Sequence, residues 1–208
     1  MLLTFQPMGD ASLRAIGRPR HVVALAASAG GLAALSQILS TLPADFPAPV
    51  LVVQHVDPHH RSWLAEILTR RTRLRVLQAQ GGERLAAGTV FLAPPGHHLL
   101  LSADGVLSLS DTLRVRFVRP SADVLFASLA ESWGGGAIAV VLSGTGRDGA
   151  DGVRAVKDHG GTVIVQDEAS AEFFGMPDAA IRTGKADQIL PLGAIAAALM
   201  ELTSGESA

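Results

Sequence analysis

Apolar residues recur along this chain in two patterns, and each pattern predicts a different secondary-structure element. Continuous apolar runs of strand length are typical of strands buried on both faces of a parallel sheet. We predict such strands at 22–27, 49–55, 137–142, 162–166 and 188–190. Apolar positions three and four residues apart predict helices after these strands, ending near Leu42, Arg70, Trp133 and His159, then a short helix and a C-terminal helix. Strands that alternate with helices favour an α/β fold with a doubly wound, mainly parallel sheet and helices on both faces.

Between Leu74 and Ser110 the pattern changes to short apolar runs separated by turn residues. The runs lie at 75–78, 89–93, 98–101 and 106–109. Pairs such as Gly81-Gly82 and Asp104-Gly105 between them are typical of hairpin turns. We therefore expect a small antiparallel hairpin region in the middle of the chain.

The chain of 208 residues has the length of one domain with a sizeable core. We expect a flexible N-terminal arm over 1–20, one folded domain over 21–203 and a frayed tail over 204–208. The apolar window 22–42 is long enough to suggest a membrane span. Serines, glycines and a change of period interrupt it, so we interpret it as a strand followed by a helix.

Composition narrows the class of protein. Hydrophobic residues make up 48% of the chain and charged residues 17%, which indicates a packed globule rather than a disordered chain. The formal net charge of −2 gives no overall attraction to nucleic acid or to an anionic membrane. The absence of cysteine excludes disulfides and thiolate metal sites, and it fits a reducing, cytoplasmic compartment.

Candidate chemistry gathers where three predicted strands end. Ser28 follows the first strand at a turn into a helix, where Gly30 and Gly31 allow the backbone to bend tightly. His55 ends the second strand, and Asp148 lies in a glycine-rich loop after the third. Because the carboxyl ends of parallel strands meet at one edge of a sheet, we expect these three residues to converge.

Serine, histidine and aspartate are the residue types of a nucleophilic hydrolase site. The Ser28 hydroxyl needs a base, His55 can accept its proton near neutral pH, and Asp148 can stabilise the imidazolium that forms. Backbone N–H groups of Ala29 or Gly30 are candidates for an oxyanion hole. Each residue also has a structural interpretation, Ser28 as a cap or packing residue and His55 as a strand-end histidine. The chain order Ser, His, Asp differs from that of the α/β-hydrolases.

The glycine-rich loop supports a competing hypothesis. Gly144, Gly146 and Gly149 have the spacing of a dinucleotide-binding fingerprint between a strand and a helix, and Asp167 follows the next strand. An aspartate directly before the third glycine would direct negative charge at a pyrophosphate, which weakens this hypothesis. From the residues alone, a serine hydrolase and a dinucleotide-binding domain both remain open.

Several segments together resemble the protein-glutamate methylesterases of bacterial chemotaxis (CheB type). They lie at 27–31, 53–55, 93–98, 119–126, 142–150, 166–170 and 174–177, in the family's order. The likeness runs from about His21 to Leu202, which is nearly the whole chain.

The resemblance implies a doubly wound catalytic domain over 21–203 and a role for each strand-end residue. Ser28 would be the nucleophile, His55 the base and Asp148 its orienting acid. The family hydrolyses glutamate γ-methyl esters on chemoreceptor helices, releasing methanol, and many members also deamidate receptor glutamine. We therefore expect a cytoplasmic serine esterase without a cofactor, whose partner is a methylated chemoreceptor or a similar helical bundle. A non-catalytic domain that only binds such helices is the alternative.

The chain departs from the family's pattern at several positions. Ala29 and Leu32 stand where the family commonly has threonine and proline, and Thr145 stands where it commonly has methionine. The first change removes a hydroxyl beside the nucleophile, and the last changes packing near the imidazole. The typical family protein also has an N-terminal phospho-receiver domain, which the residues before His21 are too few to form, so we expect a free-standing esterase domain.

Other residues have both a functional and a structural interpretation. Phe174 and Met176, together with Thr145, are candidates for positioning the substrate, although core or loop packing explains Phe173, Phe174 and Met176 equally well. The adjacent histidines could ligate a metal, but neighbouring side chains diverge and no matching acid cluster is present, so we expect no metal site. These histidines are His59, His60, His97 and His98.

A run of arginines follows the second predicted helix and forms a basic edge. We interpret it as a solvated face or, alternatively, as a docking surface for an acidic receptor helix. Its members are Arg70, Arg71, Arg73 and Arg75.

Overall fold

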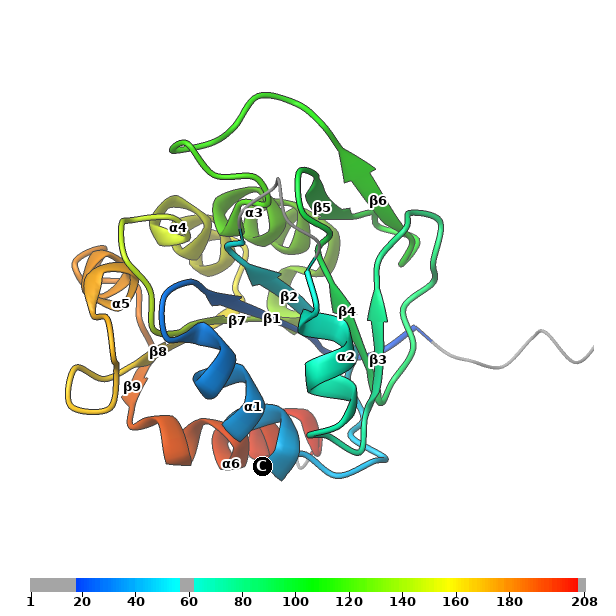
Figure 1. The fold of residues 1–208 in the computed structure, drawn as a ribbon, viewed down its shortest axis with the longest axis horizontal. Helices are drawn as coiled ribbons and strands as arrows, with labels where there is room; N and C mark the ends of the chain where they lie inside the picture. The colour runs from blue at the N-terminus through cyan, green and yellow to red at the C-terminus, as the bar shows by residue number, and fades with distance from the viewer. Residues whose placement is uncertain (1–17, 57–61, 206–208) are drawn as a thin grey trace, which may run out of the picture.

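A seven-stranded parallel sheet forms the centre of the molecule (Figure 1). The computed structural model describes residues 18–56 and 62–205. Along the sheet, the strands are β3 (Arg75–Gln78), β4 (Thr89–Leu92), β2 (Val50–Gln54), β1 (Val22–Ala27), β7 (Ala137–Val141), β8 (Thr162–Gln166) and β9 (Gln188–Leu190). Each neighbouring pair runs parallel. The predicted fold class, an α/β fold around a mainly parallel sheet, is confirmed.

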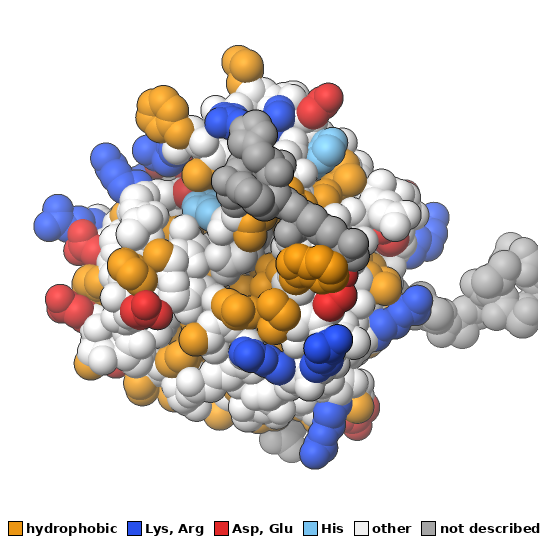
Figure 2. Space-filling model, in the orientation of Figure 1, with side chains coloured by type: hydrophobic (Ala, Val, Ile, Leu, Met, Phe, Trp, Pro, Cys, Tyr) orange, Lys and Arg blue, Asp and Glu red, His pale blue; other side chains and the backbone are white. Residues whose placement is uncertain are grey.

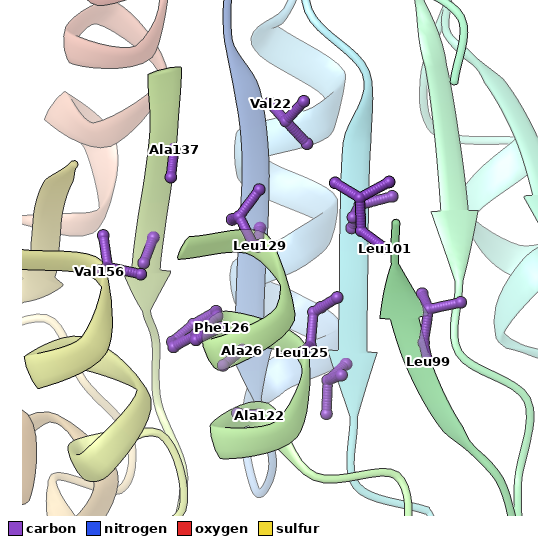
Figure 3. Close-up of a cluster of buried hydrophobic side chains, with 14 of the residues drawn as sticks. Val22, Ala26, Leu99, Leu101, Ala122, Leu125, Phe126, Leu129, Ala137 and Val156 are labelled. Carbon is purple, nitrogen blue, oxygen red and sulfur yellow. The ribbon is translucent and has the colours of Figure 1, made fainter. Parts of the chain in front are cut away.

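Helices cover both faces of this sheet (Figure 1). One face packs against α1 (Gly31–Thr41), α2 (Leu64–Thr69) and α6 (Leu192–Thr203), and the other against α3 (Ala122–Trp133), α4 (Ala150–Asp158) and α5 (Gly175–Ile181). Alternate residues of β1 belong to the two different core clusters. Figure 3 shows one of these clusters, in which Leu125, Phe126 and Leu129 of α3 lie over the sheet. Burial on both faces explains why β1 is apolar at every position.

The region 74–110 is only partly antiparallel. β5 (His98–Leu101) and β6 (Leu107–Ser110) form the expected hairpin. The other two apolar runs of this region, β3 and β4, run parallel in the main sheet. The glycines after β3 lead the chain across to β6, where the Gly82 N–H donates to the Leu107 carbonyl (2.7 Å) and the Leu107 N–H donates to the Glu83 carbonyl (2.8 Å). The chain then returns to the sheet as β4.

β1 lies where the direction of winding changes. The chain adds β2, β3 and β4 on one side of β1, and β7, β8 and β9 on the other. Ligands of open α/β sheets bind beyond the carboxyl ends of the strands at such a point. Ser28, His55 and the 142–149 loop follow the adjacent strands β1, β2 and β7, so the topology brings these segments together. Within the described ranges, no helix has both the length and the apolar character needed to span a membrane.

Candidate active site

Backbone hydrogen bonds tie the three strand ends together beyond the sheet itself. The Ser28 N–H donates to the Ser143 carbonyl (3.0 Å), and the His55 N–H donates to the Ala27 carbonyl (3.0 Å). The structure therefore brings the Ser28 turn, His55 and the start of the Asp148 loop to one edge of the sheet, where the sequence predicts them to meet.

The Ser28 turn is shaped by glycines. Gly30 has a φ of 74°, a left-handed conformation that residues with a Cβ rarely adopt. A Cβ added to Gly31 would lie 2.2 Å from the Gln54 Oε1 and 2.7 Å from the Ala27 Cβ, so only glycine fits there. Ser28 is half-buried at the mouth of an open cleft of ≈ 360 Å³ that Arg71, Glu172 and the two glycines also line.

His55 is hydrogen-bonded directly to Asp148. Its Nε2 lies 2.7 Å from the Asp148 Oδ2, and the two side chains are 13% and 3% exposed. An ionised carboxylate only accepts hydrogen bonds, so Nε2 carries the proton of this bond. The ring nitrogen left to accept a proton from a serine is therefore Nδ1.

The Asp148 carboxylate lies at the N-terminus of α3 and accepts four hydrogen bonds. Besides His55, the donors are the Ser121 hydroxyl (2.7 Å) and the N–H groups of Ala122 (2.6 Å) and Asp123 (3.1 Å). Burial raises the pKa of the Asp148 carboxyl, but the hydrogen bonds from His55, Ser121 and Ala122 outweigh burial and leave this pKa below its usual value. Asp148 is therefore held as an anion beside the imidazole.

Asp123 is the reciprocal partner of Asp148. It lies in the first turn of α3, and its Oδ1 accepts from the N–H groups of Gly149 (2.9 Å) and Gly152 (2.8 Å) at the start of α4. Burial raises the pKa of Asp123, and the hydrogen bonds from Gly152 and Arg116 only partly offset that burial and the repulsion from the Asp148 anion. Asp148 therefore caps the N-terminus of α3, where Asp123 lies, and Asp123 caps the N-terminus of α4, which follows Asp148.

This reciprocal arrangement argues against the dinucleotide hypothesis. A pyrophosphate bound to the fingerprint would need the amides at the N-terminus of α4, and Asp123 already occupies those of Gly149 and Gly152. The Asp167 carboxylate, proposed for the ribose, instead accepts from the N–H and hydroxyl of Ser170 (3.0 and 2.6 Å). The three glycines shape the turn that presents Asp148, with left-handed φ values of 86° at Gly146 and 98° at Gly149.

Sequence reasoning gave no role to Gln54, which bridges the nucleophile candidate and the base candidate. Its Nε2 donates to the carbonyls of Ser28 (2.8 Å) and His55 (3.1 Å). Its Oε1 is buried without a partner among the described residues and lies against Gly31. A polar residue that ends an otherwise apolar strand was the available signal.

Ser143 is the second residue without a predicted role. It is buried where β7 ends, and its hydroxyl donates to the Ala29 carbonyl (2.8 Å) and accepts from the Phe173 N–H (3.0 Å). Its own N–H donates to the buried Gln166 carboxamide (2.8 Å). Ser143 therefore ties the Ser28 turn to the 167–174 loop.

The amides of Ala29 and Gly30 remain available to a ligand. Neither N–H donates a hydrogen bond within the described parts of the chain, although both residues are half-buried beside Ser28. Since the Ala29 carbonyl is anchored on Ser143 (2.8 Å), the following peptide N–H points the opposite way. Two unpaired amides at a strand-to-helix turn have the chemistry of an oxyanion hole.

The other candidate positioning residues occupy different environments. Thr145 is exposed on the Asp148 loop, and Phe174 is half-buried directly before α5. Met176 is fully buried, and its N–H donates to the Gly144 carbonyl (2.8 Å). A Cβ added to Gly144 would lie 2.3 Å from the Met176 Sδ and 2.9 Å from the Ser28 Cβ. Met176 therefore lies behind Gly144, at the back of the Ser28 turn rather than in the open cleft.

His98 is a buried structural residue. Its Nδ1 accepts from the Ser121 N–H (3.1 Å), so its Nε2 carries the proton and donates to the Leu113 carbonyl (3.2 Å). His97 is exposed. Among the described residues, no group of three metal-ligating side chains is present. The other adjacent pair, His59 and His60, lies outside the described residues.

The four arginines of the basic edge are all exposed. Arg71 lines the cleft beside Ser28, where its Nη1 donates to the Ser36 hydroxyl (2.9 Å). At Arg71, the basic edge therefore borders the site.

A comparison with known families agrees with this arrangement. The family model described as CheB methylesterase matches residues 23–199. This chain belongs to the CheB methylesterase family. The protein-glutamate methylesterase FrzG of Myxococcus xanthus is 45% identical over 183 residues, which cover 88% of this chain and 55% of FrzG. A protein-glutamate methylesterase/protein-glutamine glutaminase of Anaeromyxobacter dehalogenans is 47% identical, with 88% of this chain and 53% of that protein covered.

The fold of this CheB family member is also found in a solved structure. The crystal structure of the Thermotoga maritima CheB methylesterase catalytic domain superposes with a TM-score of 0.84 at 39% identity, covering 88% of this chain and 98% of that one. This chain spans about half the length of the curated relatives that it matches.

Proposed function

We propose that this protein is a serine esterase that hydrolyses glutamate γ-methyl esters on the helices of a methyl-accepting chemoreceptor or a similar helical bundle. The observation that supports this most is the 2.7 Å bond between His55 and the buried Asp148, next to the glycine-shaped turn of Ser28. Membership of the CheB methylesterase family adds the substrate class. That the reaction takes place in the cytoplasm stays a prediction.

The reaction would begin at the Ser28 hydroxyl. As His55 Nδ1 accepts the hydroxyl proton, Oγ attacks the ester carbonyl, and the amides of Ala29 and Gly30 stabilise the oxyanion. The intermediate then collapses, the C–O bond to the methoxy group breaks, and the imidazolium gives its proton to the leaving group, which departs as methanol. Asp148 stabilises the imidazolium throughout and does not take its proton.

Water would complete the cycle. A water molecule gives a proton to His55 and attacks the acyl-enzyme, and the intermediate releases glutamate as the Ser28 Oγ recovers its proton. A glutamine side chain can enter the same sequence, with ammonia as the leaving group in place of methanol. Glutaminase activity is therefore a second expected reaction of the same site.

The test is methanol release from a methylated receptor fragment, with the wild type beside Ser28→Ala. Loss of a triad member lowers turnover by about 10⁴- to 10⁶-fold, so release should fall to background. A small activated ester, 4-nitrophenyl acetate, is measured in parallel because a competent triad cleaves it without needing a receptor. Cleavage of the small ester without methanol release would contradict the proposed substrate. Failure of both reactions in a folded wild type would contradict the esterase itself and favour a domain that only binds.

A further inference from the structure

The loop between β6 and α3, residues 111–119, runs beside the candidate active site and has a strained tip. Arg116 and Phe117 have φ values of 48° and 69°, a left-handed conformation that favours glycine. Val115 and Val118 pair on either side of them through two backbone hydrogen bonds (3.0 and 3.2 Å). Two consecutive non-glycine residues in this conformation persist only where the surroundings fix them, and such strain gathers at functional sites.

Polar anchors hold the backbone of this loop. His98 Nε2 donates to the Leu113 carbonyl (3.2 Å), and Arg119 Nη1 donates to the carbonyls of residues 111 (2.5 Å) and 112 (2.8 Å). The Arg116 guanidinium donates a hydrogen bond to the Asp123 carboxylate (3.1 Å) and also forms an ion pair with Asp151. The loop is therefore tied to the same aspartate that caps α4 behind Asp148.

The anchored loop displays apolar side chains to solvent. Phe117 is 93% exposed and Leu113 is 90% exposed, the two highest values among the exposed large apolar residues of the described chain. Phe117 also lines a small hollow of ≈ 80 Å³ together with His55. At the top of the view in Figure 2, where Figure 1 places this loop, hydrophobic and basic side chains lie next to one another.

The exposed charges next to these apolar side chains in sequence include Arg114 and the carboxylate of Asp111, at the start of the loop. Arg114 lies between Leu113 and Phe117 in the chain and is exposed, as is Arg147 in the Asp148 loop. Within the described residues, neither guanidinium is in an ion pair with a carboxylate. Exposed apolar side chains beside arginines that pair with no carboxylate of the described residues fit a partner that is both acidic and partly apolar.

We propose that the 111–119 loop is the docking element for the substrate helix, with Phe117 and Leu113 packing on its apolar positions and Arg114 facing its carboxylates. This proposal rests on the proposed function, since a helix that carries glutamates and their esters supplies both the acidic and the apolar character. The loop lies on the His55 side of the site. The basic edge at Arg71 borders the cleft of Ser28, so a helix bound by both would cross the reacting residues.

Binding can be measured without turnover in the Ser28→Ala background. The probe is the receptor fragment in its methylated form, and the added substitutions are Phe117→Ser, Leu113→Ser and, as matched control, Ile189→Ser on β9, where the side chain is 49% exposed. We expect Phe117→Ser and Leu113→Ser each to weaken binding by about 10-fold or more, and Ile189→Ser to leave it unchanged. Arg114→Gln should reduce the salt dependence of binding.

Turnover separates this proposal from the proposed function. In the Ser28-containing protein, Phe117→Ser should lower kcat/KM for the receptor fragment about 10-fold more than kcat/KM for 4-nitrophenyl acetate, mainly through KM. Equal losses on both substrates would overturn docking, because the loop would then act on the chemistry or on folding. Unchanged binding of the fragment, or no binding to the parent variant, would also overturn it. So would a concentration-dependent dimer that Phe117→Ser dissociates, since a second copy would then occupy the surface.

Discussion

The Asp148 loop and the Ser28 turn follow neighbouring strands, but they are held in place by opposite means. Asp148 is fixed by added groups, because its carboxylate accepts four hydrogen bonds from His55 and the start of α3. The Ser28 hydroxyl has no hydrogen-bond partner among the described residues. Its position is fixed by backbone bonds and by the missing side chains of Gly31 and Gly144.

This difference indicates how each region should fail. The aspartate depends on charge and on donors, so an isosteric change that removes the charge is the sharpest perturbation. The serine turn depends on empty space, so the addition of one methyl group is the sharpest perturbation there. In both regions the backbone fold can persist while the reacting geometry is lost.

Asp148→Asn should have the largest effect. The amide keeps the shape of the side chain, but it removes the anion that stabilises the imidazolium and holds its tautomer. We expect turnover of 4-nitrophenyl acetate to fall by about 10³- to 10⁴-fold. The matched control is Asp178→Asn on α5, an exposed carboxylate paired with Arg182, which should leave turnover unchanged. A loss at Asp148 as small as that of the control would mean that Asp148 has no part in the reaction.

Gly144→Ala should have the next largest effect. The added Cβ would meet the Met176 Sδ at 2.3 Å and the Ser28 Cβ at 2.9 Å, so one of these neighbours has to move. Overpacking of this kind costs about 1–3 kcal/mol of stability, and we expect displacement of the nucleophile to lower turnover by about 100-fold. Gly135→Ala is the control, since a Cβ there would lie at an ordinary 3.7 Å from the Gly160 carbonyl oxygen. Wild-type turnover in a destabilised Gly144→Ala protein would show that Ser28 does not need its present position.

The sequence predicts the strands and the convergence of Ser28, His55 and Asp148 because apolar runs mark strands, and strand ends of a parallel sheet share one edge. It does not predict the parallel pairing of β3 and β4, since their turn glycines also suit a hairpin. The sequence does not predict the reciprocal capping by Asp123 either. It depends on two helices that start side by side, a long-range relation that no local pattern in one sequence encodes.

Gln54→Glu tests the link between the two regions. The carboxamide Nε2 donates to the carbonyls of both Ser28 and His55, and a carboxylate would face the same two oxygens without a donor. We expect kcat for the small ester to fall by about 10-fold or more, with KM changed little, because the relative position of nucleophile and base is disturbed. Gln37→Glu, an exposed change on α1, is the control. Full activity of Gln54→Glu would mean that backbone bonds alone hold the two strand ends.

The smallest predicted effect is on the pH dependence of the free energy of unfolding. The two buried aspartates should contribute to it with opposite signs. The pKa of Asp148 is lowered, so its contribution to stability is fully present above its ordinary pKa of about 3.9 and is lost as pH falls toward the folded-state pKa. The pKa of Asp123 is raised. Its ionisation therefore lowers the stability of the fold above the folded-state pKa. This cost disappears as pH falls to the ordinary pKa of an aspartate.

Urea unfolding of Asp148→Asn and Asp123→Asn between pH 7 and pH 3 separates these contributions. The quantity compared with the wild type is the slope of the free energy of unfolding against pH, not its absolute value. Relative to the wild type, Asp148→Asn should lose less stability on acidification, because the group that weakens at low pH is gone. Asp123→Asn should lose more, because the wild type regains stability when Asp123 is protonated. Parallel curves for the two variants would contradict the opposite pKa shifts. The two carboxylates would then act as a single site, despite capping different helices.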